Sequence, residues 1–383
     1  MANNTLTPTR ADGVRTNALR SGTLPGYAKW ACLAGSLAAS ALVFAVAGWN
    51  WPLFGVLGAL LYLGSWTIVN AAVRGGRHGS NVFWATLVWI AFFLALVPLV
   101  SIIWTVLSNG TRGILEFGFF GSDMAGVTGV QDQAAAAGES GVLGGIKHAL
   151  IGSLLITLVA TLISVPIGLL TSIWLVEYAR GGLLARVITF LVDVMTGIPS
   201  IVAGLFAAGV LMAHFEFVGG GYSGGNQIMG FTAAVALSVL MIPVVVRSTE
   251  EMLRVVPNEL REASYALGVR KWRTILRVVI PTAISGIASG VTLAIARVAG
   301  ETAPILLTAG MAVTTNWNVF KGWMMTLPVF IYQQLMRPTA PSAPDPSTQR
   351  AWGAALVLII IVMLLNLIAR FIAAAFAPKQ PGR

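Results

Sequence analysis

The segment RSTEEMLRVVPNELREASYALGVRKWRTILRVVIP, residues 247–281, is too polar to cross a membrane, although long apolar runs stand on both sides of it. Its apolar residues recur at three- and four-residue intervals, which predicts an amphipathic helix. Asn258 is placed to cap this helix, and Gly268 to end it in a left-handed conformation. A second short helix is expected over 271–279, and Pro281 is expected to begin the next span. The segment is therefore predicted to be a helical hairpin that projects from the membrane. The apolar stripe consists of Val255, Val256, Leu260, Ala263, Ala266 and Leu267.

The predicted hairpin would carry this apolar stripe and Tyr265 on a projecting tip. The plainer interpretation is a solvated hairpin whose basic residues keep it on the inner side of the membrane. That interpretation does not explain the apolar side chains, because an exposed apolar face on a small hairpin usually packs against a partner. We therefore favour a docking role for this segment.

The composition places the chain among membrane proteins. Of its 383 residues, 56% are hydrophobic and only 10% are charged. Soluble domains carry about 25% charged residues, so an integral membrane protein is predicted. The net charge of +10 does not indicate nucleic-acid binding, because the basic residues form no single patch along the chain.

Cysteine and histidine usage predicts neither a disulfide framework nor a metal site. Cys32 is the lone cysteine, which excludes an internal disulfide. The histidines stand near span ends in unlike contexts, so no metal cluster is expected. They are His78, His148 and His214. No Ser-His-Asp or paired-carboxylate pattern predicts catalysis.

Eight apolar segments are long enough, or nearly so, for the roughly 20 residues that a transmembrane helix needs. They lie near 29–49, 51–72, 82–106, 149–177, 187–213, 229–247, 282–308 and 352–376. We expect an all-α polytopic membrane protein.

Lys and Arg are distributed unequally between the two sides of these spans. If both termini are cytoplasmic, seventeen of the 24 Lys and Arg residues face the cytoplasm and five face the outside. This is the positive-inside pattern, and an even number of spans agrees with it. We expect a multi-pass protein of the plasma (inner) membrane, with residues 1–28 as a cytoplasmic tail.

Composition divides the rest of the chain into three parts. Residues 29–81 are expected to form a hairpin of two spans without intramembrane charge. Residues 82–148 form one span and an outer loop, in which the Gly- and Ala-rich stretch 129–145 predicts a flexible linker. Residues 149–377 hold the other spans and a second outer loop, where a proline interrupts 323–335 and predicts an interfacial or re-entrant segment.

RVAGETAP, residues 297–304, places two ionisable side chains inside an apolar run. A charge at the centre of a membrane helix costs about 2.5–3.5 kcal/mol, so such residues usually face an interior cavity. Arg297 and Glu301 are four residues apart and are expected to share one helix face. One interpretation is that they neutralise each other and fix helix packing. The other is that Arg297 binds an oxyanion, Glu301 holds it in place, and Thr302 adds a hydroxyl. Pro304 would loosen the helix, as is typical of a helix that lines a pathway.

Two further acidic residues stand near span ends. Glu177 is interpreted as an interfacial ion-pair residue near Arg180. Asp193 lies deeper, and is expected either to pair with an arginine of a partner subunit or to reach toward water.

REASYALGVRKWRTILRVVIPTA, residues 261–283, resembles the EAA loop of ABC-importer permeases. That pattern is Glu-Ala-Ala, then a spaced Gly, then an apolar residue and Pro, and Ser264 stands where the family has its second alanine. The resemblance implies a coupling helix that docks in a groove of a separate ATP-hydrolysing subunit. The residues that it assigns to this contact are Glu262, Ala263, Tyr265, Ala266 and Gly268. The chain has no G-x-x-x-x-G-K-[ST] motif, so we expect a transport subunit that is not an enzyme, with ATP and Mg²⁺ bound by the partner.

Three further stretches are similar to permeases of the phosphate-specific (Pst-type) ABC importer, particularly its A-type subunit. They are DVMTGIPSIVAGLF (193–206), ARVAGETAPILLTAG (296–310) and LPVFIYQQ (327–334). The resemblance covers roughly 145–375 and implies a type I ABC importer transmembrane domain of about six core spans, to which the first two spans are additional. The residues that it places at a helix break are Gly197, Pro199 and Ser200.

The resemblance also implies a substrate and partners. The substrate is inorganic phosphate, and the partners are a second, C-type permease subunit, an ATPase dimer and an extracytoplasmic phosphate-binding protein, besides membrane lipid. Because an arginine does not distinguish one oxyanion from another, a permease for sulfate or molybdate stays open. An ion-coupled secondary transporter is a further alternative, with Glu301 as its coupling carboxylate. A non-transporting membrane scaffold would explain the spans but not the intramembrane charges.

Overall fold

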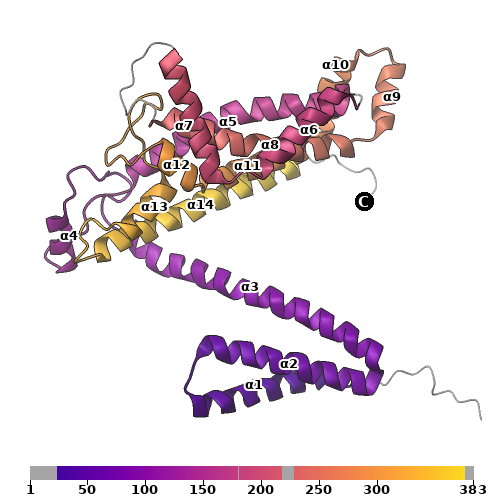
Figure 1. The fold of residues 1–383 in the computed structure, drawn as a ribbon, viewed down its shortest axis with the longest axis vertical. Coiled ribbons are helices and arrows are strands. Elements are labelled where there is room, and N and C mark those ends of the chain that lie inside the picture. Colours follow the sequence, from indigo (N-terminus) through magenta and orange to yellow (C-terminus); the bar gives the residue numbers. More distant parts are fainter. Residues whose placement is uncertain (1–23, 180, 218–227, 376–383) are drawn as a thin grey trace, which may run out of the picture. The chain divides into compact units, whose positions relative to one another are not determined.

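The computed structural model describes residues 24–179, 181–217 and 228–375, with the side chains of 212–217 left out. Most of the predicted N-terminal tail, Arg180 and the side chain of His214 therefore lie outside the described residues. All regular secondary structure within these ranges is helical (Figure 1). The chain divides into two compact units, one ending at Ile103 and one beginning at Trp104, and each is described by itself.

The first unit contains a helical hairpin, as the sequence predicts. α1 (Ala28–Ala47) and α2 (Trp51–Arg74) pack against each other. Asn50 caps α2, because its side chain accepts a hydrogen bond from the Leu53 amide at 3.2 Å. α3 (Gly76–Ile114) is longer than its predicted segment and contributes to both units.

Four long helices form the centre of the second unit (Figure 1). They are α5 (Lys147–Ile173), α8 (Gly230–Val255), α11 (Ile280–Ala299) and α14 (Asp345–Ala375). α8 packs against both α5 and α11, and α14 packs against α11. Small residues bring these helices close together, since a Cβ on Gly168 would lie only 2.6 Å from the Val245 side chain. Close approach at small residues is the usual way in which membrane helices pack.

A π-helical turn adjoins two of these helices. η1 (Trp174–Tyr178) extends α5, and η2 (Ile275–Val279) leads into α11. Pro281 lies in the first turn of α11, as predicted, although the helical run that contains α11 begins earlier, at Lys271. The π-helical turn that precedes Pro281 lacks the regular α-helical hydrogen bonds, so the missing amide hydrogen is tolerated there.

The fifth apolar segment, predicted as one span near 187–213, consists of two helices. α6 (Leu183–Thr196) and α7 (Ser200–Phe217) are bent by 114° at the short break between them. Pro199 has no amide hydrogen and cannot continue α6, and its carbonyl instead accepts from the Val202 amide at 2.9 Å. The described residues therefore contain seven helices that are long and apolar enough to cross a membrane, or eight if this bent pair counts as one crossing.

The seventh segment, predicted to continue to residue 308, also breaks. α11 ends at Ala299, and α12 (Ala303–Thr308) begins after a short turn. Pro304 lies in the first turn of α12, where its missing amide hydrogen costs nothing. A Cβ on Gly204 of α7 would lie 2.8 Å from Pro304 Cα, so α7 and α12 are in direct contact near their N-terminal ends.

The two loops that the sequence analysis places outside the membrane are more ordered than predicted. α4 (Gly129–Ala136) lies in the Gly- and Ala-rich stretch, and Thr128 and Gln131 form a capping box at its start. The prediction of a flexible linker is wrong here, because Asp132 of α4 is buried and paired with an arginine of α14. α13 (Leu327–Met336) packs against α14 and α5, and its proline lies in the first turn of the helix.

Candidate functional site

The predicted helical hairpin forms between α8 and α11 (Figure 1). α9 (Asn258–Ala266) is followed by α10 (Lys271–Thr274) and then by η2. Gly268 has a φ of 73° and donates its amide to the Tyr265 carbonyl at 2.9 Å, so the left-handed turn predicted here is confirmed. The predicted cap is wrong, because Asn258 is the first residue of the helix and a proline precedes it without a side-chain cap.

One side of the hairpin is buried. Ser264 is 8% exposed, and its hydroxyl lies 2.8 Å from that of Thr274. This is the position at which the EAA pattern has alanine. Serine keeps the small size that lets the two helices approach and adds a hydrogen bond between them. Val256, which the sequence analysis placed in the apolar stripe, is buried beside Leu253 and belongs to the core.

The opposite side of the hairpin is exposed. Tyr265 is 41% exposed, and Leu267, just past the helix end, is 83% exposed. The residues that the resemblance assigns to the ATPase contact are exposed as well, and we term them the docking face: Glu262, Ala263, Tyr265, Ala266 and Gly268.

Three charged residues tie the hairpin to the end of α5. Arg261 donates from Nε and Nη2 to Glu177 Oε1 at 3.0 and 2.9 Å. The same guanidinium donates to the Val256 and Leu253 carbonyls at 2.6 and 3.0 Å, and Lys271 donates to the Glu177 carbonyl. We term Glu177, Arg261 and Lys271 the Glu177 cluster.

The sequence did not reveal the Glu177 cluster. The prediction of an ion pair at Glu177 is confirmed, but Arg180 lies outside the described residues and the pair forms with Arg261, 84 residues further along the chain. The two side chains are 5% and 12% exposed, so this is a largely desolvated ion pair. Glu177 lies in the π-helical turn η1, which brings it to the hairpin. No local sequence pattern predicts that contact.

Asp193 pairs with an arginine of the same chain. Arg247 donates from Nη2 to Asp193, and from Nη1 to Glu250 at 3.1 Å. The expectation of a partner from another subunit is therefore wrong, and the pair joins α6 to α8. The Asp193 side chain is 56% exposed, so solvent screens the contact and its contribution to stability is small.

Neither here nor elsewhere in the described ranges do three or more His, Cys, Asp or Glu residues gather closely enough to hold a metal ion.

The residues predicted to form the substrate pathway lie at the break between α11 and α12. Arg297 is exposed on the last turn of α11, and Glu301 and Thr302 are half-buried within the break. Because α11 ends at Ala299, Arg297 and Glu301 do not share a helix face, and no ion pair joins them in the part of the chain that the structure describes. The interpretation that they neutralise each other is wrong, and so is the expectation that Glu301 holds Arg297 in place.

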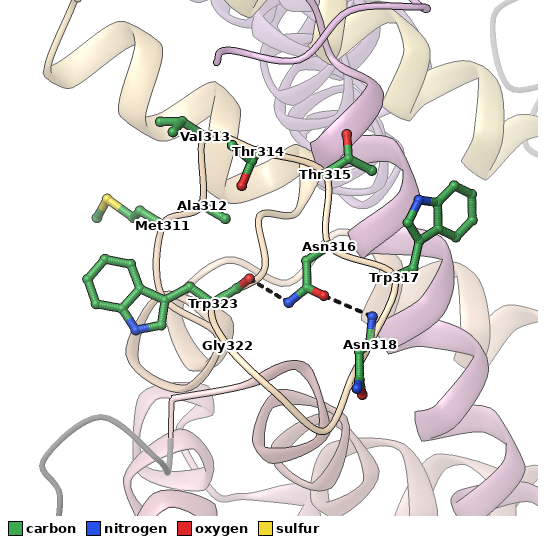
Figure 2. Close-up of a pocket in the computed structure, with 10 residues that line it drawn as sticks. All are labelled: Met311, Ala312, Val313, Thr314, Thr315, Asn316, Trp317, Asn318, Gly322 and Trp323. Atoms are coloured by element: carbon green, nitrogen blue, oxygen red, sulfur yellow. Dashed lines mark hydrogen bonds between the residues drawn. The ribbon is translucent and has the colours of Figure 1, made fainter. Parts of the chain in front are cut away.

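A pocket of about 630 Å³ lies in the loop that follows α12 (Figure 2). Asn316 shapes this loop, because its amide donates to the Lys321 and Trp323 carbonyls at 2.8 and 3.0 Å and its oxygen accepts from the Asn318 amide at 2.8 Å. Figure 2 shows Trp317 and Trp323 at opposite sides of the pocket, and these side chains are 69% and 53% exposed. The loop thus presents an aromatic surface.

Asp123 anchors this loop to the segment that follows α3. It accepts hydrogen bonds from the Thr315 amide and hydroxyl at 3.0 and 3.1 Å, and from the Ala125 amide at 3.1 Å. Burial raises the pKa of Asp123, but these hydrogen bonds outweigh that effect and hold the pKa below its ordinary value. The carboxylate therefore stays ionised at neutral pH and keeps the loop in place.

Comparison with known proteins decides the family. Residues 164–380 match the model of the binding-protein-dependent transport system inner membrane component. The phosphate transport system permease protein PstA 1 of Mycobacterium tuberculosis (strain CDC 1551 / Oshkosh) is 45% identical over 296 residues, which are 77% of this chain and 89% of that protein. The chain belongs to the PstA family. The PstA protein of Yersinia pestis is 37% identical over 285 residues, or 74% of this chain and 87% of that protein.

Membership of the PstA family confirms the resemblance seen in the sequence. The helical structure and the family model agree with the type I ABC importer transmembrane domain that the resemblance implied. Among solved structures, a chain of the MetNI methionine ABC transporter in an inward-facing conformation has 20% identity and a TM-score of 0.45, over 59% of this chain and 94% of that chain. The family model begins within α5, and α1 to α3 precede it.

Proposed function

We propose that this PstA-family chain is the permease subunit of an ATP-driven importer that carries inorganic phosphate across the plasma membrane. The observation that carries the proposal is 45% identity, over 77% of the chain, to a protein named as a phosphate transport system permease. The exposed docking face and the lack of a P-loop motif in the sequence support dependence on a separate ATPase.

In this proposal, movement driven by ATP enters the chain through the docking face. An ATPase dimer, which holds the ATP and Mg²⁺, contacts that face from the cytoplasm. The turn at Gly268 and the Ser264–Thr274 hydrogen bond keep α9 and α10 in a fixed relation. Movement of α9 is therefore passed to α8, which leads into it, and to α11, which follows through η2.

Arg297 is the proposed anion contact. It is exposed on a spanning helix and has no ion-pair partner among the described residues. Facing lipid would cost about 2.5–3.5 kcal/mol, so we assign it to a polar path shared with a second permease subunit. Its guanidinium can bind two oxyanion oxygens at once, and the Thr302 hydroxyl can donate beside it. Glu301 would tune this affinity by repelling the bound anion.

The proposed partners are a C-type permease subunit, the ATPase dimer and an extracytoplasmic phosphate-binding protein. We place the chain in the inner membrane with both termini in the cytoplasm, because that arrangement puts seventeen of the 24 Lys and Arg residues inside. Counting the bent pair α6–α7 as one crossing keeps the number of crossings even.

The names of the relatives favour phosphate over sulfate or molybdate, and the docking face favours an ATP-driven importer over ion coupling.

Removal of the Arg297 guanidinium should abolish most phosphate uptake. A charge-assisted contact is worth about 1.5–3 kcal/mol, so uptake of radiolabelled phosphate by cells carrying Arg297→Ala should fall about ten- to a hundredfold. Arg297→Lys keeps the charge without the planar fork and should give an intermediate rate. Membrane level and bound ATPase are measured in parallel. Normal uptake by Arg297→Ala at a normal level would exclude the anion contact.

Glu262→Ala should separate coupling from the pathway. This change alters the docking face and leaves Arg297 untouched, so uptake should be lost together with co-purification of the ATPase. Arg297→Ala should lose uptake but retain the bound ATPase. If Glu262→Ala keeps both, the docking face is assigned to the wrong residues.

A further inference from the structure

A second pocket, of about 200 Å³, lies at the start of α5, at the far end of that helix from the Glu177 cluster. α5 is 27 residues long, which separates the two places by about 40 Å along the helix. The pocket is too small for a drug-sized ligand but has room for an ion of a few heavy atoms and its water. Its polar lining residues are His148, Gln333, Gln334, Arg337 and Thr339.

His148 is buried at this pocket without a hydrogen-bond partner. The residue is 2% exposed, and neither Nδ1 nor Nε2 has a partner in the described part of the chain. The ring packs edge-on against Phe330, with a centroid distance of 5.3 Å. A neutral imidazole offers one N–H donor and one bare nitrogen that accepts. Buried polar groups rarely stay unpaired, so this ring suits a ligand that can both accept and donate.

Two neighbouring residues are oriented so that further donors remain available. The Gln334 side-chain oxygen accepts from Arg350 Nε at 3.2 Å, which leaves its NH₂ group free of that bond. Thr339 Oγ1 accepts from Arg350 Nη2 at 3.5 Å, which leaves its own hydrogen available. Arg350 thus fixes the orientation of both side chains by hydrogen bonds, although it does not itself line the pocket.

The lining of the pocket includes one cationic side chain and no anionic one. Arg337 lines it and forms no ion pair within the ranges that the structure describes. No carboxylate lines it, although the ionised Asp123 carboxylate, which accepts the Thr315 and Ala125 hydrogen bonds, lies near enough to interact electrostatically with His148. One cation and several donors therefore converge on a small space.

We propose that the pocket at His148 is a binding site for a small free oxyanion, on the side of the membrane opposite to the docking face, with Arg337, Gln334 and His148 as its ligands. The inference rests on the proposed function only for the choice of phosphate. Hydrogen phosphate carries a P–OH group at neutral pH, which can donate to the bare imidazole nitrogen, whereas sulfate has no such hydrogen. The site therefore selects phosphate over sulfate, and it is distinct from the Arg297 pathway.

Equilibrium binding of radiolabelled phosphate tests this site in the full-length chain, with the subunits that co-purify, in lipid nanodiscs and phosphate-free buffer. His148→Phe and Arg337→Gln should each weaken binding at least tenfold, and His148→Gln, which can still donate and accept, should retain part of it. His78→Phe is the matched control and should bind like the wild type. Sulfate should compete at least tenfold more weakly than phosphate.

Three results would overturn the proposal. The first is wild-type phosphate affinity in both His148→Phe and Arg337→Gln, provided that thermal melting shows both to be folded. The second is equal competition by sulfate. The third is loss of phosphate binding in anionic nanodiscs but not in neutral ones, which would assign the pocket to a lipid headgroup. By contrast, failure of the wild type to take up phosphate in cells would contradict the proposed function itself.

Discussion

Replacement of Arg350 by methionine should cost the folded protein about 3–5 kcal/mol, because it leaves the Asp132 carboxylate buried without its partner. Both side chains are 1% exposed. The guanidinium donates from Nη1 to Asp132 Oδ1 at 3.0 Å and from Nη2 to Oδ2 at 2.5 Å, which is a paired geometry. It also donates to the Leu143 carbonyl at 2.9 Å and to the Ser347 hydroxyl at 3.1 Å. The Arg350 side chain thus joins α14 to α4 and to the segment that follows α4.

The measurement is the melting temperature of the purified chain in detergent, together with its level in the membrane. Arg350→Met should lower both strongly. Arg370→Met is the matched control, because Arg370 is an exposed arginine on the same helix, and it should melt like the wild type. Arg350→Met combined with Asp132→Leu should recover much of the loss, since no uncompensated charge then remains. An unchanged melting temperature in the single variant would show that the pair is not a major source of stability.

Removal of Arg261 should uncouple the hairpin from the membrane helices. Arg261→Ala leaves the Glu177 carboxylate, whose side chain is 5% exposed, without its counter-charge. It also removes the hydrogen bonds that Arg261 donates to the Val256 and Leu253 carbonyls, which lie in the segment that leads into α9. Breaking a buried pair costs about 3–5 kcal/mol, which is enough to displace the hairpin locally without unfolding a chain of this size. We expect phosphate uptake to fall at least tenfold while the chain remains in the membrane.

Arg254→Ala provides the control for this prediction. Arg254 lies in the last turn of α8 with its side chain 67% exposed, and its partner Glu250, although only 7% exposed, keeps Arg247 as a second ion-pair partner when Arg254 is removed. Uptake by Arg254→Ala should match the wild type. Amide hydrogen exchange of residues 258–274 should rise in Arg261→Ala and not in Arg254→Ala. Equal uptake and equal exchange in the two variants would mean that the Glu177 cluster does not position the hairpin.

Local patterns predicted the hairpin well because its turn depends on neighbouring residues. Gly268 ends α9 in a left-handed conformation, and the start of α10 follows within a few residues. The Asn258 cap failed because the preceding proline already sets the extended backbone at the helix start. The apolar segments were found for a similar reason, since length and hydropathy are properties of single stretches. Hydropathy alone did not show the breaks after Thr196 and after Ala299, because the apolar composition continues through both of them.

The partners of the charged residues could not be predicted in this way. Asp132 and Arg350 are 218 residues apart, and Glu177 and Arg261 are 84 apart. A linear pattern carries no signal at such separations, so the sequence predicts an ion pair at Glu177 without identifying Arg261, and a flexible linker over 129–145. Conversely, Arg297 and Glu301 are close in sequence and yet unpaired among the described residues, because the helix ends between them.

The sequence by itself determined that this is a helical membrane protein of the PstA family, with a projecting hairpin that ends in a glycine turn. Those conclusions depend on composition, hydropathy and short motifs, which are properties of contiguous residues. The tertiary structure alone decided which charges pair, that a second span breaks after Ala299, and that the unpaired ring of His148 borders a pocket beside Arg337. The physical reason is that ion pairs and pockets form between residues that only packing brings together.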